Sequence, residues 1–244
     1  HKFMAIIPAH NEERVVKNLI ESLKEQDYPK DKLDIYVIAD NCTDNTATIA
    51  KEAGAIVYER NDPEHKTKGY AMQWFLKKMQ EQNVDYDALF VFDADNIVDK
   101  NFTKAMNKKL CQGEEVVQGY RDIKNPDVTW VTAGYALFYW MMHRFYHLAR
   151  YNVGLSPLLN GTGFMVKYDL IKNEGWNTKT LTEDIEFSLI NISKGRALGW
   201  ATDAIVYDEQ PTSFKQSWSQ RSRWTVGHMQ CLKTYTGQLY NCLL

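Results

Sequence analysis

The stretch Leu89-Phe90-Val91-Phe92-Asp93-Ala94-Asp95-Asn96 places two carboxylates directly after four apolar residues. Four apolar residues in a row indicate a buried strand, and the acidic pair then falls where that strand ends. In a parallel α/β sheet, the carboxyl ends of the strands open on the ligand crevice. Hard oxygen donors at that point favour Mg²⁺ or Mn²⁺, which usually bring a phosphate group with them. Because two acids are also common in solvated loops, the rest of the chain must decide.

The composition is that of an ordinary globular chain of 244 residues, with 44% hydrophobic and 25% charged residues, and it predicts one domain. A net charge of −2 gives no sign of the basic surface that binds nucleic acid, so no nucleic-acid partner is expected. The cysteines show no metal-ligand spacing, which favours a reducing compartment and a cytosolic location. They are Cys42, Cys111, Cys231 and Cys242.

No stretch of the sequence is long and apolar enough to predict a membrane-spanning helix. The longest uncharged stretch runs from Val128 to Met142 and is followed by His143 and Arg144, whereas a span needs about 20 residues. The chain shows no signal peptide and begins almost inside an expected strand, without an initiator methionine. We therefore expect a domain excised from a longer protein.

Strands and helices alternate along the first half of the chain. Strands are expected at residues 3–7, 33–39, 55–58 and 89–92, with helices between them. This alternation indicates a mostly parallel sheet with helices on both faces. After Asp95 the pattern is looser. Strands are expected near 115–120 and 164–167, and a further strand is expected to end at 206–207. Helices are expected near 102–110, after an N-cap at Thr182, and from about Phe214.

The aromatic-rich segment from Tyr135 to Tyr151 is expected to form a further helix. Five large side chains fall on one face of that helix, and the basic residues lie largely elsewhere. The five are Tyr135, Phe138, Tyr139, Met142 and Tyr146. This pattern is typical of a core helix with an exposed basic edge, and it also permits a helix that packs near a membrane or a partner helix.

Polar residues recur where strands end and helices begin. Asp40 could accept from a base or ribose, Asp95 could hold a cation, and Lys68 at a helix start could meet a phosphate. Singly, each is more often a turn or surface residue, and only their joint placement favours a nucleotide-diphosphate site. Further along, the glycines of Asn160-Gly161-Thr162-Gly163 permit close backbone approach by a ligand.

Two later motifs add acids and a cationic helix face. Thr182-Glu183-Asp184 places two acids at a helix N-terminus, where they could simply cap the helix or act as carboxylates of lowered pKa. Gln220, Arg223 and Trp224 share one helix face. That face suits a diphosphate beside a sugar ring, although an arginine paired with a surface acid beside a core tryptophan gives the same pattern.

Six motifs resemble, in order, those of family 2 glycosyltransferases. They are Pro8-Ala9-His10-Asn11-Glu12-Glu13, Asp40-Asn41-Cys42-Thr43-Asp44, Lys68-Gly69, Asp93-Ala94-Asp95, Thr182-Glu183-Asp184 and Gln220-x-x-Arg223-Trp224. The last two resemble the processive branch that includes cellulose, chitin and hyaluronan synthases. The second motif departs from the pattern, because Asn41 and Cys42 follow Asp40 where a second acid and a glycine or serine are usual.

The resemblance implies a GT-A fold, which is an α/β, Rossmann-like, mixed and mostly parallel sheet with helices on both faces. A single domain, residues 1–244, would comprise a nucleotide-binding half (1–100) and an acceptor and catalytic half (101–244). The implied reaction is inverting, metal-dependent transfer of glucose or N-acetylglucosamine from a UDP-sugar to a glycan or glycolipid, with Mg²⁺ or Mn²⁺. The enzyme would lie at the cytoplasmic face of a membrane, held there by segments absent from this chain.

The resemblance also distributes roles over the motifs. Asp184 would be the general base, and Asp95 would ligate the metal. The nucleotide-sugar would contact Ala9, Glu12, Asp40, Lys68, Asp93, Gln220 and Arg223. The acceptor would contact Gly161, Thr162, Glu183 and Trp224.

Two other protein classes also fit the Asp-x-Asp motif. A phosphatase of the haloacid-dehalogenase type would want Thr or Val where this chain has Ile97, and it usually carries the motif on its first strand. The main alternative is a non-catalytic nucleotide-sugar or glycan-binding module of the same fold. Intact Asp95, Asp184 and Arg223 argue against that alternative.

Overall fold

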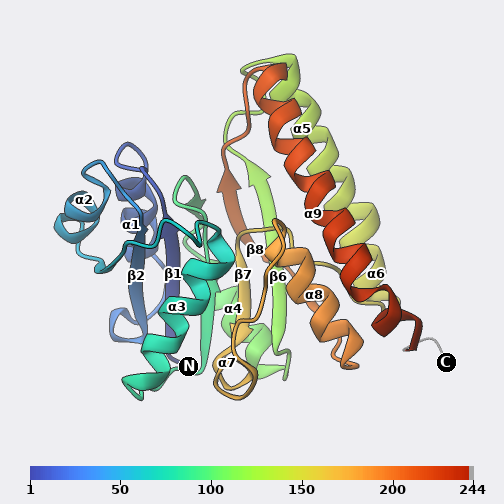
Figure 1. Ribbon diagram of the computed structural model, residues 1–244, viewed down its shortest axis with the longest axis horizontal. Coiled ribbons are helices and arrows are strands. Elements are labelled where there is room, and N and C mark those ends of the chain that lie inside the picture. Colours follow the sequence, from blue (N-terminus) through green and yellow to red (C-terminus); the bar gives the residue numbers. More distant parts are fainter. Residues whose placement is uncertain (242–244) are drawn as a thin grey trace.

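The computed structural model describes residues 1–241, the side chains at 239 and 241 excepted (Figure 1). Its sheet has eight strands in the order β3-β2-β1-β4-β7-β6-β8-β5. The strands are β1 (Phe3–Ala9), β2 (Leu33–Asp40), β3 (Ile56–Arg60), β4 (Ala88–Val91), β5 (Ile97–Val98), β6 (Val116–Ile123), β7 (Phe164–Lys167) and β8 (Gly199–Asp208).

The sheet is mixed and mostly parallel, as predicted. Strands β3, β2, β1 and β4 pair in parallel, and β6 pairs in parallel with β8. Strand β7 runs antiparallel to both β4 and β6, so β6 and β8 point the same way as β4. The short edge strand β5 is antiparallel to β8. Six strands therefore share one direction, and their carboxyl ends lie at one edge of the sheet.

Helices cover both faces of this sheet (Figure 1). The α-helices are α1 (Val16–Lys24), α2 (Thr46–Glu52), α3 (Lys68–Glu81), α4 (Phe102–Cys111), α5 (Trp130–Met141), α6 (Leu148–Asn152), α7 (Tyr168–Glu174), α8 (Glu183–Ser193) and α9 (Phe214–Asn241). A 3₁₀ turn, η1 (Lys30–Lys32), precedes β2, and a π-helix, η2 (Met142–His147), joins α5 to α6.

Two hydrophobic cores lie on opposite faces of the sheet, and β1 contributes to both. Phe3, Ala5 and Ile7 pack on the side of α1 and α4, whereas Met4 and Ile6 pack on the side of α3. Because side chains alternate along a strand, a central strand that is covered on both faces must be apolar at nearly every position. This requirement explains the continuous apolar runs of β1 and β4.

Several elements of the second half differ from the sequence prediction. Strand β8 ends at Asp208, close to the strand end predicted at 206–207, but it extends over ten residues, from Gly199, and its register with β6 shifts between Gly119 and Tyr120. This irregularity and the exposed Asp203 interrupt the apolar pattern that would have revealed the strand. The two-residue β5 and the seven-residue α7 were not predicted, because both are too short to show a period.

The aromatic helix predicted between Tyr135 and Tyr151 is interrupted by the π-helix η2. His143 and His147 of η2 are buried, and the His147 ring stacks on Trp200 at 5.1 Å between centroids. Burial lowers the pKa of His143 to about 3 and that of His147 to about 4, so both rings stay neutral near pH 7. The predicted basic edge is therefore partly a neutral, buried pair of histidines.

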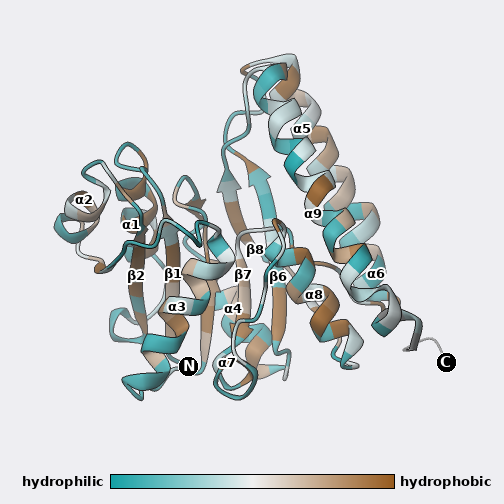
Figure 2. Cartoon of the chain, viewed as in Figure 1, coloured by the Kyte–Doolittle hydropathy of each residue, from teal (hydrophilic) through white to brown (hydrophobic). Residues whose placement is uncertain are grey.

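Only part of the predicted aromatic face is buried in the core. Tyr135 and Tyr139 are buried, whereas Phe138 is 43% exposed. Further apolar side chains of α5 point to solvent, and this helix and α9 together form a long pair that flanks the rest of the molecule (Figures 1 and 2).

Thr182 occupies the N-cap position of α8, as predicted, but its side chain makes no capping hydrogen bond. The hydroxyl instead faces Cys231 of α9, with 3.7 Å between Oγ1 and Sγ. Packing between α8 and α9 therefore takes the hydroxyl of this N-cap residue away from the helix end.

Gly119 lies where β6 and β8 change register, and the space around it is closed by backbone. A Cβ atom at Gly119 would lie 2.6 Å from the carbonyl oxygen of Ala204 and 2.7 Å from that of Gly163. We expect Gly119→Ala to lower the free energy of unfolding by about 1–3 kcal/mol, measured by urea denaturation. Gly134→Ala is the matched control, because open space surrounds this position in α5 and the change should stabilise the helix by about 0.5–1 kcal/mol. Equal stability of wild type and Gly119→Ala would contradict the close packing.

Candidate active site

A cleft of about 730 Å³ opens at the carboxyl ends of β1, β4, β6 and β8, and α8 and α9 also contribute residues to its lining. Most of the predicted site residues line it. They are Glu12, Lys68, Asp93, Asp95, Gly161, Glu183, Asp184, Gln220, Arg223 and Trp224. Three predicted residues, Ala9, Asp40 and Thr162, are not part of the lining. Motifs far apart in sequence thus meet because parallel strands end at one edge.

Lys68 ties the two halves of the cleft together. Its ammonium group lies 2.5 Å from Oδ1 of Asp93 and donates to the carbonyl oxygen of Gly161 at 2.7 Å. A carboxylate oxygen of Glu183 lies 3.6 Å away. Although burial alone would lower the pKa of Lys68, Asp93 and Glu183 raise it, so the lysine stays charged. The charge of Lys68 thereby compensates the carboxylates of Asp93, just after β4, and Glu183, at the start of α8.

Two adjacent acids stand at the N-terminus of α8, on the cleft wall. Burial raises the pKa of Glu183 to about 7; Lys68 opposes this rise and Asp184 adds to it. Burial also raises the pKa of Asp184, against backbone N–H donors at the helix start and the charge of Lys68. A carboxylate whose pKa is raised toward neutrality is a better proton acceptor, as a general base requires.

Gly161 lies next to Asp184 in the lining of the cleft. Its backbone lies in the left-handed region, with φ of +90°, and a Cβ atom there would lie 3.6 Å from Oδ2 of Asp184. A larger side chain at Gly161 would therefore cover the carboxylate, and glycine also fits the backbone conformation without strain. With glycine at this position, the Asp184 carboxylate stays part of the cleft lining.

Asp95 lies among other carboxylates. Burial and the charges of Asp208, Asp93 and Glu12 raise its pKa to about 7. The Lys124 ammonium donates to the backbone oxygen of Asp95 at 2.7 Å. The Asp95 carboxylate accepts a hydrogen bond from the side-chain amide of Asn96. Negative charge is thus incompletely compensated around Asp95, which favours a bound cation.

The donor set suits a divalent ion that is shared with a phosphate. No group of three His, Cys, Asp or Glu side chains in the described part of the chain is arranged to hold a metal by itself. Mg²⁺ and Mn²⁺ sites often take only one or two protein carboxylates, with substrate phosphates and water completing the shell. Asp95, with Asp93 next to it, fits that pattern.

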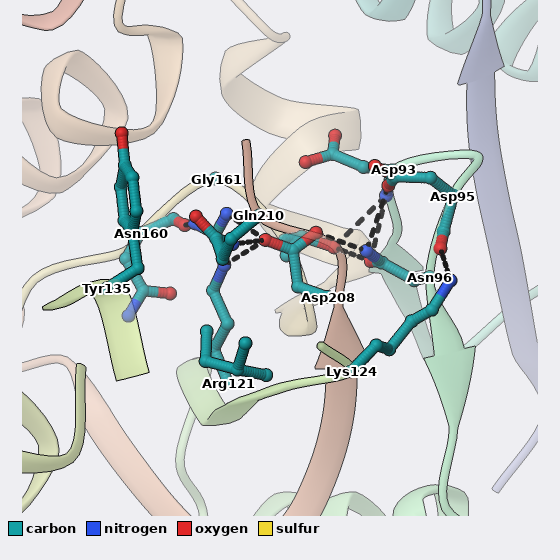
Figure 3. Close-up of polar contacts among 12 residues, drawn as sticks. Asp93, Asp95, Asn96, Arg121, Lys124, Tyr135, Asn160, Gly161, Asp208 and Gln210 are labelled. Carbon is teal, nitrogen blue, oxygen red and sulfur yellow. Dashed lines mark hydrogen bonds and ion pairs between the residues drawn. The ribbon is translucent and has the colours of Figure 1, made fainter. Parts of the chain in front are cut away.

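Arg121 and Asp208 form a buried ion pair at the base of the cleft, and the sequence did not point to either residue (Figure 3). Arg121 donates through Nε (2.9 Å) and Nη2 to Oδ2 of Asp208, and Asn96 donates to Oδ1 at 2.8 Å. Arg121 also donates through Nη1 to the backbone oxygen of Asn160 at 2.8 Å. Both residues lie near the carboxyl ends of their strands, the signal that identified Asp95, but the irregular β6–β8 pairing concealed it.

The side-chain amide of Asn160 is buried but has no hydrogen-bond partner among the described residues, at either Nδ2 or Oδ1. Its backbone is held firmly by the Arg121 bond and by a 2.9 Å bond from its N–H to Gln118. Asn160 lines the cleft next to Gly161. A buried amide without partners is costly unless a ligand satisfies it, and sugar hydroxyls can both donate and accept.

Thr162 lies beneath the cleft, where it supports Asp93. Its hydroxyl accepts from the N–H of Asp93 at 3.0 Å and donates to Oδ1 of Asn96, and the residue is fully buried. In this arrangement Thr162 positions the Asp93 backbone rather than reaching the cleft itself.

Asp40 is also buried, and its carboxylate is occupied. Arg60 donates to Oδ1 of Asp40 at 2.6 Å, and Asn41 donates to the same oxygen at 3.0 Å. Arg60 in turn donates to Asp62 at 2.8 Å. The predicted base or ribose contact of Asp40 would therefore be made by a carboxylate that Arg60 already orients.

Gln220, Arg223 and Trp224 share one face of α9, as their spacing predicts, and all three line the cleft. Oε1 of Gln220 accepts from the hydroxyl of Tyr135 at 2.8 Å, and the Trp224 ring meets the Tyr135 ring edge-on at 6.3 Å. Arg223 is exposed and available to an anionic group.

The junction between α8 and α9 fixes the position of these motifs relative to each other. Glu186 accepts from the N–H groups of Lys179 and Thr180, each at 2.7 Å, and from the hydroxyl of Tyr235 at 2.8 Å. Gly227 packs so closely on Thr182 that a Cβ atom would lie 2.5 Å from its methyl group. Helices α8 and α9 are therefore interlocked next to Asp184.

Comparison with known proteins identifies similar chains. A family model described as "Glycosyltransferase like family 2" matches residues 1–227. A probable glycosyltransferase, YdaM of Bacillus subtilis, is 28% identical over 98% of this chain and 58% of its own length. The beta-monoglucosyldiacylglycerol synthase of Synechocystis is 25% identical over 92% of this chain and 47% of its own length. The chain thus spans roughly half the length of these curated relatives.

Solved structures share the fold. The mannosyltransferase PcManGT from Pyrobaculum calidifontis, in complex with GDP-Man and Mn²⁺, has a TM-score of 0.73 at 18% identity and covers 96% of this chain and 64% of its own. The glucosyl-3-phosphoglycerate synthase of Mycobacterium tuberculosis, with Mn²⁺, UDP-glucose and phosphoglyceric acid, has a TM-score of 0.62 at 16% identity, covering 94% and 79%. The predicted GT-A fold is confirmed.

The Arg121–Asp208 pair gives a test of the cleft base. Arg121→Met leaves the Asp208 carboxylate buried without its main partner, so we expect the free energy of unfolding in urea to fall by about 3–5 kcal/mol. The double variant Arg121→Met/Asp208→Leu should recover part of this loss, because it also removes the unpaired charge. Arg14→Met, at an exposed arginine, is the control and should change stability by about 0.5 kcal/mol or less. A single variant as stable as wild type would show that Asp208 does not depend on Arg121.

Proposed function

The chain belongs to glycosyltransferase family 2, and from that premise we propose that it moves a sugar, glucose or N-acetylglucosamine, from a UDP-sugar to a glycan or glycolipid with inversion at the anomeric carbon. The observation that carries this proposal is that Gly161 lies beside the carboxylate of Asp184 and is linked through Lys68 to the carboxylate of Asp93. A donor held near Asp93 and an acceptor hydroxyl near Asp184 would meet in front of that glycine.

The donor would occupy the side of the cleft formed by the first half of the chain. Glu12, Lys68 and Asp93 line that side, and they offer acceptors for ribose or sugar hydroxyls and a cation near the phosphates. A UDP donor is supported by the UDP-glucose complex of one structural neighbour, although another neighbour was solved with GDP-Man. Asp40 would reach the base or ribose from its ion pair with Arg60.

Asp184 would remove the proton of the acceptor hydroxyl while that oxygen attacks the anomeric carbon from the face opposite the diphosphate. The raised pKa of its buried carboxyl supports this role, since a stronger base accepts the proton more readily. The acceptor sugar would contact Glu183, Trp224 and the side-chain amide of Asn160, whose hydrogen-bonding groups are unsatisfied among the described residues.

The leaving diphosphate needs positive charge. Asp95 would hold Mg²⁺ or Mn²⁺, which when bound neutralises charge that develops on the diphosphate. Arg223 would add a second, protein-based cation from α9, and Gln220 would contact the donor from the same helix face. Mn²⁺ in the two neighbouring complexes supports the choice of metal.

The setting of the enzyme is part of the proposal. We place the domain at the cytoplasmic face of a membrane, with membrane segments contributed by sequence outside this chain. The name of the Synechocystis relative, a diacylglycerol glycolipid synthase, supports a lipid-linked acceptor, and the relatives' greater length leaves room for such segments.

Replacement of the proposed base gives the central test. We expect Asp184→Asn to reduce transfer by about 10²–10⁴-fold, because the amide cannot take the acceptor proton, while UDP binding by calorimetry stays within about threefold. Asp169→Asn, at an exposed carboxylate on α7, should leave transfer unchanged. Transfer would be read as UDP release over a panel of UDP-sugars and acceptors. UDP binding with no turnover by the wild type on any pair would favour the non-catalytic binding module.

The proposed metal ligand has its own test. Added Mn²⁺ should stimulate UDP release by the wild type, and Asp95→Ala should lose this response because the cation has lost its protein ligand. Asp203→Ala, which removes an exposed carboxylate of β8, should respond like the wild type. A full Mn²⁺ response in Asp95→Ala would show that another carboxylate holds the metal.

A further inference from the structure

The side chain of Asn96 makes hydrogen bonds in four directions among the acids of the cleft, although it is fully buried (Figure 3). Its Nδ2 donates to Oδ1 of Asp208 at 2.8 Å and to Oδ1 of Asp95 at 3.2 Å. Its Oδ1 accepts from the N–H of Asp93 at 3.2 Å and from the hydroxyl of Thr162. A carboxamide offers two donor hydrogens and two acceptor positions, so all the hydrogen-bonding capacity of Asn96 is used.

The partners of Asn96 dictate which way its amide faces. Ionised carboxylates only accept hydrogen bonds, so the NH₂ end faces Asp95 and Asp208. The backbone N–H of Asp93 only donates, so the oxygen end faces that group. A reversed amide would set N–H against N–H and oxygen against carboxylate. The amide of Asn96 therefore has a single favourable orientation.

The shorter of the two bonds from Nδ2 leads to a carboxylate that is itself fixed. Oδ2 of Asp208 accepts from Nε of Arg121 at 2.9 Å and from the side-chain amide of Gln210. Oδ1 of Asp208 accepts from Asn96, and Asp208 is almost completely buried. Asn96 is thus held by an ion pair between β6 and β8, and not by its own loop alone.

Asp95 lies in a turn that Asn96 closes. The backbone N–H of Asn96 donates to the carbonyl oxygen of Asp93 at 3.1 Å, and Lys124 donates to the carbonyl oxygen of Asp95 at 2.7 Å. These bonds hold the main chain of the turn, and the 3.2 Å bond from Asn96 holds Oδ1 of the Asp95 carboxylate. Within residues 1–241, Oδ2 of that carboxylate accepts no hydrogen bond, and Asp95 lines the cleft.

We propose that Asn96 is a positioning residue for a divalent cation: its amide anchors one oxygen of the Asp95 carboxylate to Asp208 and leaves the other oxygen for the cation. The inference rests on one part of the proposed function, the binding of a divalent cation by Asp95. Hydrogen bonds that hold a metal ligand from behind orient that ligand and strengthen metal binding. The affinity for the cation is then set partly from β6 and β8, through Arg121 and Asp208.

A purely structural role for Asn96, as a tie between the end of β4 and the end of β8, predicts a different result. Loss of such a tie would lower the stability of the fold without distinguishing one cation from another. Mg²⁺ requires nearly ideal octahedral geometry, whereas Ca²⁺ accepts irregular and flexible coordination. A carboxylate that is no longer held in one orientation should therefore weaken Mg²⁺ binding more than Ca²⁺ binding.

The test is calorimetric titration of the 244-residue chain with Mg²⁺ and with Ca²⁺, each in the presence of UDP, and with UDP in cation-free buffer. We expect Asn96→Ala to weaken Mg²⁺ binding about 10–100-fold, Ca²⁺ binding about threefold or less, and cation-free UDP binding about twofold or less. Asn191→Ala is the matched control and should bind Mg²⁺ like the wild type. Asn191 is also a buried amide, which donates to Phe187 at 2.8 Å and accepts from Arg196 at 3.1 Å, but it contacts no acid of the cleft.

Asn96→Ser is the second variant if Asn96→Ala folds poorly in a urea titration. Its hydroxyl has a single donor hydrogen and cannot serve both acids, so Mg²⁺ binding should still weaken about tenfold. Wild-type affinity for Mg²⁺ in both Asn96 variants would overturn the inference and leave the proposed function intact, and so would an equal loss for Mg²⁺ and Ca²⁺. Absence of Mg²⁺ binding by the wild type would overturn the inference together with the proposed metal site. Because cation binding needs no turnover, a wild type that binds Mg²⁺ as expected but transfers no sugar would contradict the proposed transfer alone.

Discussion

Repulsion among carboxylates at the end of β4 is the constraint on which the site depends. Asp93 and Asp95 follow β4 and come close to Asp208 at the end of β8, and burial makes the charges of Asp95 and Asp208 costly. Three cations compensate part of this charge: Lys68 beside Asp93, Arg121 beside Asp208, and Lys124 beside Asp95. The charge that remains around Asp95 supports the proposed binding of a cation there and, with it, of the donor's diphosphate.

The first half of the fold could be predicted because its strands are covered on both faces. Burial on both faces requires continuous apolar runs, and those runs made β1 and β4 visible and placed Asp93 and Asp95 at a strand end. Motif order then located Glu12, Lys68, Asp184 and the α9 face in one cleft.

The other parts of the site could not be predicted, because they depend on irregular strand pairing or on contacts that only the folded chain makes. Arg121 and Asp208 belong to strands whose pairing shifts at Gly119, so neither showed a regular alternation. The role proposed for Asn160 depends on its side-chain amide having no hydrogen-bond partner within the described part of the chain, which a sequence cannot show. Asp40 and Thr162 were identified by type, but only the structure shows that Arg60 and Asn96 occupy their polar groups.

The interlock between α8 and α9 limits how this enzyme can be recombined with others. Because Glu186 binds Tyr235 and Gly227 has no room beside Thr182, the terminal helix is not an independent module. A chimera that exchanges α9 alone would leave Glu186 without its hydroxyl partner and would set a foreign surface against Thr182. The smallest block that keeps this interlock, residues 178–241, also contains β8, so the exchanged segment would have to supply its own partner for Arg121 in place of Asp208. The proposed base and the cationic face of α9 would then be inherited together.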